Sequence, residues 1–80
     1  MSTSGIPSPS AGFKGCVAFR ESGDRPFLVY AGLYGILPST WHSLGYSGTA
    51  GQHSVALQNR AFDRLFAKYG TAPWAPYDGC

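Results

Sequence analysis

The apolar positions of this chain recur with a helical period most clearly in residues 54–70, SVALQNRAFDRLFAKYG. Ser54 is a favourable N-cap residue, and Gly70 is a typical helix stop. The apolar side chains between them follow i, i+3, i+4 spacing, which predicts a helix with one buried face. They are Leu57, Ala61, Phe62, Leu65, Phe66 and Tyr69.

A second helical pattern covers residues 10–22, with Ser10 as the candidate N-cap and Gly23 as the stop. Phe13, Cys16 and Val17 share its apolar face. Glu21 follows one turn after Val17, at the edge of that face. The pattern therefore predicts a short helix that ends next to an acidic side chain.

Between these helices the pattern is mixed. Residues 24–37, DRPFLVYAGLYGIL, are rich in β-forming residues and are interrupted by Gly32 and Gly35. Periodicity leaves both a short hairpin and an irregular loop open. The following PSTWHSLG predicts a short helix, with Pro38 in its first turn and Gly45 as its stop. The fold class predicted is mainly α, a small α+β domain at most, with about three helices.

Length and composition restrict the function classes. A chain of 80 residues is one domain, and we expect a flexible Ser/Pro leader at 1–9 before a domain at 10–80. Charged residues make up 12%, the net charge is +2, and the basic residues are scattered, which argues against a nucleic-acid partner. No apolar run is long enough for membrane insertion, and the start lacks the features of a signal peptide. Weak basicity is compatible with an anionic polymer such as a bacterial cell wall.

The chain has two cysteines, Cys16 and Cys80. A bridge between them would close a loop across nearly the whole fold and contribute roughly 4 kcal/mol in the chain-entropy model. It would also indicate an oxidising compartment. Two free thiols remain an alternative, as does a zinc site with His42 and His53, although the spacing matches no zinc motif.

Glu21 is the candidate catalytic residue. Cleavage of a glycosidic bond needs a carboxylic acid that stays protonated, and partial burial against apolar groups raises the pKa of a carboxyl. The C-terminal end of a helix dipole acts in the same direction. The alternative, a solvated glutamate at a helix end, is compatible with the same spacing.

The motifs ESG, GLYGILPSTWHSLGYSG and SVALQNRAFDRLFAKYGTAPWAPYDGC together resemble the small transglycosylase-like domain of resuscitation-promoting factors and related actinobacterial and phage wall-lytic proteins. The similarity covers roughly residues 12–80. It implies a reduced lysozyme-like fold, a Cys16–Cys80 disulfide and peptidoglycan as the substrate.

The resemblance also implies roles for single residues. Glu21 matches the catalytic acid, Thr40 the site threonine, and Gln58 a glutamine that lines the sugar groove. Trp41 matches a tryptophan that packs behind the threonine, so we expect it in the core. The chain departs from the family pattern in three respects: the cysteine lies five residues before Glu21 instead of next to it, Gly35 stands where the family has a glutamine, and the Glu21–Thr40 loop is short.

Aromatic side chains are candidate platforms for sugar stacking. Tyr34 in the glycine-rich loop is the first choice, followed by Tyr30, Tyr46 and Trp74, with packing in the core as the alternative for each. Asp24 is the nearest candidate for a second carboxylate, although we expect it to cap or solvate the turn that follows the helix, which favours a scheme with a single acid. We expect His42 and His53 on the surface, outside the site.

These observations predict a peptidoglycan-cleaving glycosidase that cuts the β-1,4 bond between N-acetylmuramic acid and N-acetylglucosamine with one acid, Glu21, and without a metal or cofactor. The product is left open between a lytic transglycosylase and a lysozyme. We expect a monomer that acts outside the cell on glycan strands, as a secreted protein, a phage lysin or part of a virion. The alternatives are a non-catalytic wall-binding or virion structural module of the same shape and, against the charge pattern, a helix-turn-helix nucleic-acid binder.

Overall fold

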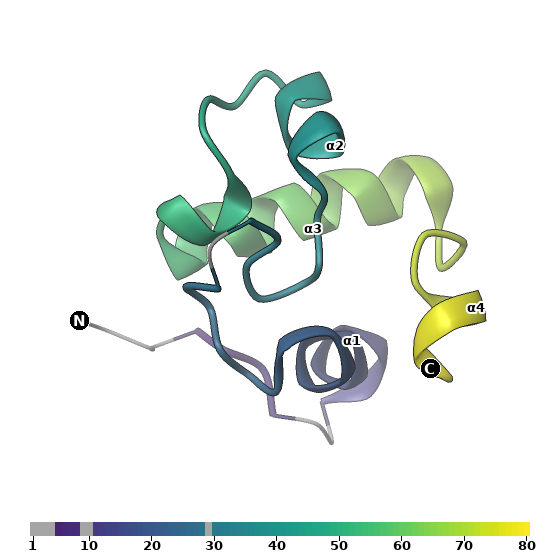
Figure 1. Ribbon diagram of the computed structural model, residues 1–80. Coiled ribbons are helices and arrows are strands. Elements are labelled where there is room, and N and C mark those ends of the chain that lie inside the picture. The colour runs from purple at the N-terminus through teal and green to yellow at the C-terminus, as the bar shows by residue number, and fades with distance from the viewer. Residues whose placement is uncertain (1–4, 9–10, 29) are drawn as a thin grey trace.

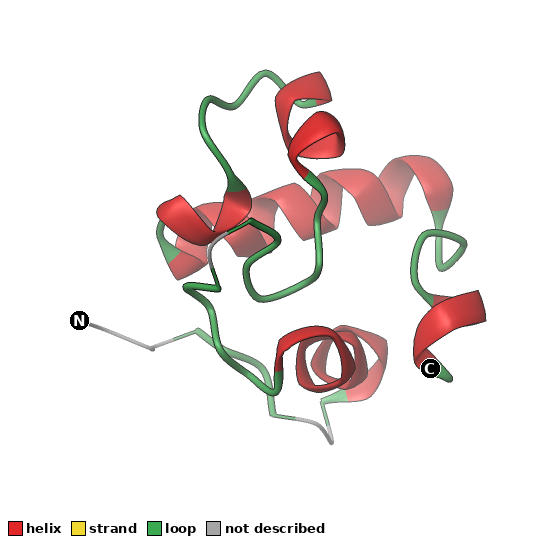
Figure 2. Cartoon of the chain, in the orientation of Figure 1, coloured by secondary structure: helices red, strands yellow, loops and turns green. Residues whose placement is uncertain are grey.

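The computed structural model describes residues 5–8, 11–28 and 30–80, and helices make up its regular secondary structure. Over these residues the chain contains no strand (Figure 2). The chain is a small all-α domain with two substantial helices and two short ones. In order, the elements are α1 (Gly12–Ser22), α2 (Pro38–Ser43), the 3₁₀ turn η1 (Ala50–Gln52), α3 (Val55–Tyr69) and α4 (Ala75–Asp78).

Helix α3 crosses the middle of the molecule, with α1 on one side and α2 on the other (Figure 1). The predicted cap is confirmed, because the hydroxyl oxygen of Ser54 accepts the Leu57 N–H at 3.1 Å. The predicted stop at Gly70 is confirmed as well. The buried face of α3 consists of Val55, Gln58, Ala61, Phe62 and Leu65. Phe66 and Tyr69, at the end of the predicted apolar stripe, are partly exposed instead.

Helix α1 begins at Gly12, two residues after the predicted start. Ala11 occupies the N-cap position, and Ser10, the predicted cap, lies outside the described residues. The helix ends as predicted, since Gly23 has a left-handed backbone (φ 62°) and donates its N–H to the Phe19 carbonyl at 2.8 Å. This glycine stop fixes Glu21 in the last turn of α1.

The segment 24–37 is the irregular loop, and the alternative of a hairpin is wrong for its described residues, which form turns. Gly32 and Gly35 have positive φ angles of 61° and 66°, and such a backbone does not continue a strand. Ser22 attaches this loop to α1, because its hydroxyl is buried and bonds the carbonyl oxygens of Ala18 and Leu33 at 2.9 and 2.8 Å. The hydroxyl hydrogen serves one acceptor at a time.

The C-terminal tail folds back onto α1, and the disulfide between Cys16 and Cys80 is confirmed, with 6.0 Å between the Cα atoms. The bridge excludes the two alternatives of free thiols and a zinc site that uses them. In addition, the described residues contain no cluster of histidine, cysteine and acidic side chains suited to a metal ion. Helix α4, which the sequence pattern did not predict, contacts α1 (Figure 1).

Part of the predicted leader lies against the domain. Ile6 packs on the core, and the Gly5 carbonyl accepts a hydrogen bond from the Asn59 amide at 3.0 Å. Residues 1–4 and 9 of that predicted leader lie outside the described residues. Among the helices of the described part, none has the length and apolar character needed to cross a membrane.

Candidate functional site

Glu21 is half-buried in the last turn of α1, and its side chain lies directly against the backbone of Gly35. A Cβ atom added to Gly35 would come within 2.6 Å of the Glu21 carboxyl carbon and 3.0 Å of its Cγ. The absence of a side chain at residue 35 is therefore what allows the carboxyl group to approach the loop this closely.

Gly35 also lines a small hollow of about 120 Å³ between the loop, α2, α3 and the tail. Thr40, predicted as the site threonine, lines the same hollow and is partly buried. Gly35 thus lies against the Glu21 side chain and lines the hollow that Thr40 also lines. The other lining residues are Ile36, Leu37, Leu65, Pro73 and Trp74, so the walls are mainly apolar.

The surroundings of Glu21 raise the pKa of its carboxyl from 4.5 to about 7. The largest cause is burial, which removes water from the ionised form, followed by a hydrogen bond with the Asp78 side chain and by the charge of Asp78. Glu21 accordingly keeps its proton to a higher pH than an ordinary glutamate does. A carboxyl group of this kind can donate a proton to a bound substrate and recover it.

Asp78 is the residue near Glu21 that the sequence pattern did not indicate. Asp78 is the last residue of α4, and Cys80, two positions later, is bonded to Cys16 on α1. Cys16 precedes Glu21 by five residues, so a bridge that ties Cys80 to α1 also brings Asp78 toward Glu21. The signal that could have identified Asp78 was therefore the disulfide.

Gln58 does not line a groove, which corrects the role predicted for it. Its side chain is fully buried and makes all of its hydrogen bonds within the chain. The Oε1 atom accepts the Leu33 N–H at 2.7 Å, and the Nε2 group donates to the carbonyls of Pro26 and His53 at 2.8 and 3.0 Å. Gln58 therefore holds the loop that carries Gly35 against α3, because it replaces the backbone partners that the loop lacks.

Tyr34 and Trp74, both predicted as stacking platforms, are buried in the structure. Tyr34 is fully buried, its ring packs on Phe62, and its hydroxyl donates to the Asn59 side chain. Burial and the nearby charges of Asp63 and Asp24 raise the pKa of the Tyr34 hydroxyl. Trp74 is 3% exposed and donates its indole N–H to the Tyr34 carbonyl at 2.9 Å. The Tyr34 ring therefore has no free face for a sugar, whereas the Trp74 ring, although buried, forms part of the wall of the small hollow.

Tyr30 is the predicted platform that remains exposed, at 68%. Tyr46 is partly buried against Trp41, with 4.7 Å between the ring centroids. Trp41 is fully buried, so its prediction as a core residue is confirmed. His42 is exposed, as predicted, and His53 is partly buried against the Trp41 ring.

Among the described residues, Asp24 makes no recorded contact with Glu21. It follows the Gly23 stop with a positive φ of 62°, and its charge contributes to the raised pKa of Tyr34. Asp78, instead of Asp24, is the carboxyl group that acts on Glu21.

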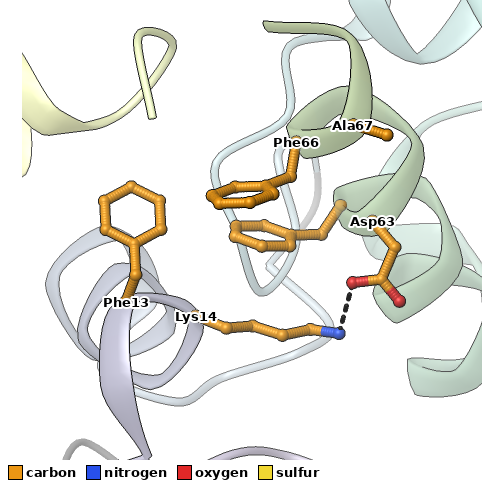
Figure 3. A pocket seen from close by; sticks show the side chains of 6 residues that line it. Phe13, Lys14, Asp63, Phe66 and Ala67 are labelled. Carbon is orange, nitrogen blue, oxygen red and sulfur yellow. Dashed lines mark hydrogen bonds and ion pairs between the residues drawn. The ribbon is translucent and has the colours of Figure 1, made fainter. Parts of the chain in front are cut away.

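A larger hollow of about 320 Å³ lies between α1 and α3, at the other end of α1 from Glu21. Phe13 and Phe66 project into it, and Lys14 bridges to Asp63 at 2.8 Å along its edge (Figure 3). Asp63, the acidic group of this hollow, is already paired with a lysine. The smaller hollow beside Glu21 is therefore the candidate site.

The comparisons with known proteins add no relative. No protein-family model matches the chain, and the searches of curated proteins and of solved structures find no significant match.

The contact between Gly35 and Glu21 leads to a testable prediction. Gly35→Ala is expected to destabilise the domain by about 2–5 kcal/mol, the sum of a left-handed alanine and an overpacked contact. It is also expected to lower the pKa of Glu21 toward its ordinary value, because the displaced carboxyl gains water. Urea denaturation and an NMR titration of Glu21 measure the two effects.

Gly23→Ala is the matched control, since Gly23 has a φ of 62° and no atom within 4 Å of its added Cβ. This variant carries only the cost of the left-handed backbone, about 1–2 kcal/mol. Equal losses for the two variants would show that the Gly35–Glu21 contact has no energetic weight.

Proposed function

We propose that this chain is a peptidoglycan-cleaving glycosidase with a reduced lysozyme-like fold and Glu21 as its general acid. The observation that carries the proposal is a half-buried carboxyl, packed on Gly35 beside the hollow of Thr40, whose pKa is raised to about 7. A structural glutamate at a helix end is normally solvated and has no need of a raised pKa. The family resemblance of the ESG and PSTWHSLG motifs supports peptidoglycan as the substrate.

The reaction begins when Glu21 transfers its proton to the β-1,4 glycosidic oxygen between N-acetylmuramic acid and N-acetylglucosamine. The C1–O bond then breaks, N-acetylglucosamine leaves with its 4-hydroxyl, and an oxocarbenium-like centre forms at C1 of the muramic acid. The ionised Glu21 next accepts a proton from the group that attacks C1. That group is the 6-hydroxyl of the same sugar in a lytic transglycosylase, or water in a lysozyme.

Thr40 is the polar side chain that we assign to substrate positioning, since it lines the apolar hollow that adjoins Glu21 through Gly35. Its hydroxyl can both donate and accept a hydrogen bond with the sugar. Tyr30, which is exposed, is the remaining candidate for stacking.

The Cys16–Cys80 disulfide supports action outside the cytoplasm, because such bridges persist in oxidising compartments. The bacterial cell wall lies in a compartment of that kind, outside the cytoplasm. A secreted protein, a phage lysin and a virion component are all compatible with this setting.

The test is digestion of purified peptidoglycan across pH 4–9, with mass spectrometry of the released muropeptides. We expect cleavage to decrease about tenfold per pH unit above pH 7, because the acid form of Glu21 is lost there. Anhydro-muramic ends would identify a transglycosylase, and reducing ends would identify a hydrolase. A rate that keeps rising to pH 9 would contradict Glu21 as the acid.

A second candidate function is a non-catalytic module that binds the wall. Its support is that Tyr34, Trp74 and Gln58 are buried, so few of the predicted sugar contacts are exposed. Wall pull-down without any released muropeptide would favour this function over the glycosidase.

A further inference from the structure

Helices α1 and α4 are in contact, and the Asp78 carboxyl at the end of α4 forms a pair with the Glu21 carboxyl in the last turn of α1. One oxygen of Asp78, Oδ2, is buried and, apart from a protonated Glu21, has no hydrogen-bond donor among the described residues; Oδ1 of Asp24 is the other buried carboxyl oxygen without a donor there. A buried acceptor oxygen without a hydrogen-bond donor destabilises the folded state. We therefore expect a neighbouring group to donate a hydrogen bond to it.

A protonated Glu21 supplies that donor. Two ionised carboxylates cannot bond each other, because neither has a hydrogen to donate, whereas one shared proton makes a strong O–H···O⁻ bond. The pair therefore favours the state in which Glu21 holds a proton.

The other titratable groups on α1, the adjoining loop and α4 do not provide this contact. On α1, Arg20 is exposed, and the adjoining loop contributes Tyr34, whose hydroxyl is already bonded to Asn59. On α4, Tyr77 is 82% exposed. Asp78 is the charged partner that acts on Glu21.

The disulfide keeps the pair together. Helix α4 has four residues, which is too short to be stable alone; it contacts α1, and Cys80, two residues beyond Asp78, is covalently tied to Cys16 on α1. Trp74, buried at the start of the same segment, fixes its other end.

We propose that Asp78 is a positioning residue for Glu21: it accepts the Glu21 proton in a hydrogen bond, orients that carboxyl group beside the hollow, and keeps it in the acid form between turnovers. The role of Asp78 in catalysis rests on the proposed glycosidase function, whereas the pairing of the two carboxyl groups does not.

The experiment compares Asp78→Asn with the wild type by ¹³C NMR. Glu21 is the single glutamate of the sequence, so ¹³C-glutamate labelling follows one side-chain carboxyl. Asn keeps an acceptor oxygen and loses the charge, and we expect the titration midpoint of Glu21 to fall by about one pH unit. Cleavage at pH 8 should then fall roughly tenfold, with little change at pH 5.

Asp24→Asn is the matched control, since it removes the same charge three residues from Glu21 and asparagine tolerates a positive φ. Its Glu21 midpoint should stay at the wild-type value. An unchanged midpoint in Asp78→Asn, or an equal change in Asp24→Asn, would overturn the inference.

The two failures are distinguishable. A midpoint that does not move, in a protein that cleaves peptidoglycan, removes Asp78 from the mechanism and leaves the proposed function intact. A midpoint that moves, in a protein that cleaves nothing at any pH, establishes the carboxyl pair but overturns both the proposed function and the catalytic role of Asp78.

Discussion

Glu21→Gln is expected to lower peptidoglycan cleavage by about 10²–10⁴-fold, the usual contribution of a general acid. Glutamine has nearly the same shape and keeps the contact with Gly35, but it cannot transfer a proton to a glycosidic oxygen. Muropeptide release at pH 5, where the wild-type carboxyl is protonated, gives the cleanest comparison. Activity within tenfold of the wild type would exclude Glu21 as the acid.

The same substitution is expected to stabilise the protein at alkaline pH. The folded pKa of Glu21, about 7, lies above the ordinary value of 4.5, so the folded state binds more protons than the unfolded state between these values. The stability linked to Glu21 is thus fully present below pH 4.5 and is lost as the pH rises through 7. Glutamine cannot ionise and avoids this loss.

The size of that gain is limited by solvent. The full shift corresponds to roughly 3 kcal/mol, and because the side chain is only half-buried, screening reduces the expected gain to about 1 kcal/mol. Thermal unfolding should show Glu21→Gln melting about 4–8 °C above the wild type at pH 8, with little difference at pH 4. A variant that is less stable than the wild type at pH 8 would contradict the burial of this carboxyl.

Sequence reasoning succeeded where local chemistry decides the structure. Ser54 and Gly70 bound α3, and Gly23 stops α1 beneath Glu21, because caps and left-handed glycines act within one turn. The position of Trp41 in the core was also predicted correctly.

It failed where the outcome depends on contacts distant in sequence. Gln58 was assigned to a groove, yet Leu33 and Pro26, about thirty residues away, occupy its side chain. Tyr34 was chosen for its place in a glycine-rich loop, but the loop folds inward over Phe62. Other aromatic side chains, such as Tyr30, Tyr69 and Tyr77, remain exposed, so the small core of this domain holds only some of them. Composition does not indicate which of the aromatic residues fill it.

Removal of the Cys16–Cys80 disulfide is expected to cost roughly 4 kcal/mol, because the unfolded chain regains the freedom of a loop that spans most of the sequence. A domain of this size has about 5 kcal/mol in total, so the Cys16→Ser/Cys80→Ser variant should be largely unfolded at 37 °C. Urea denaturation monitored by circular dichroism measures the loss. Wild type treated with a reductant should behave like the variant, and the variant itself should not respond to the reductant.

The disulfide is also expected to matter for the site, since it is the covalent tie between the helix of Glu21 and the segment of Asp78. In conditions where the variant remains folded, at low temperature and with a stabilising osmolyte, α4 should detach and the Glu21 midpoint should fall toward the value of Asp78→Asn. A folded variant with the wild-type midpoint would show that buried contacts such as that of Trp74 hold α4 without the bridge. The bridge would then stabilise the fold alone, and the acidity of Glu21 would be independent of it.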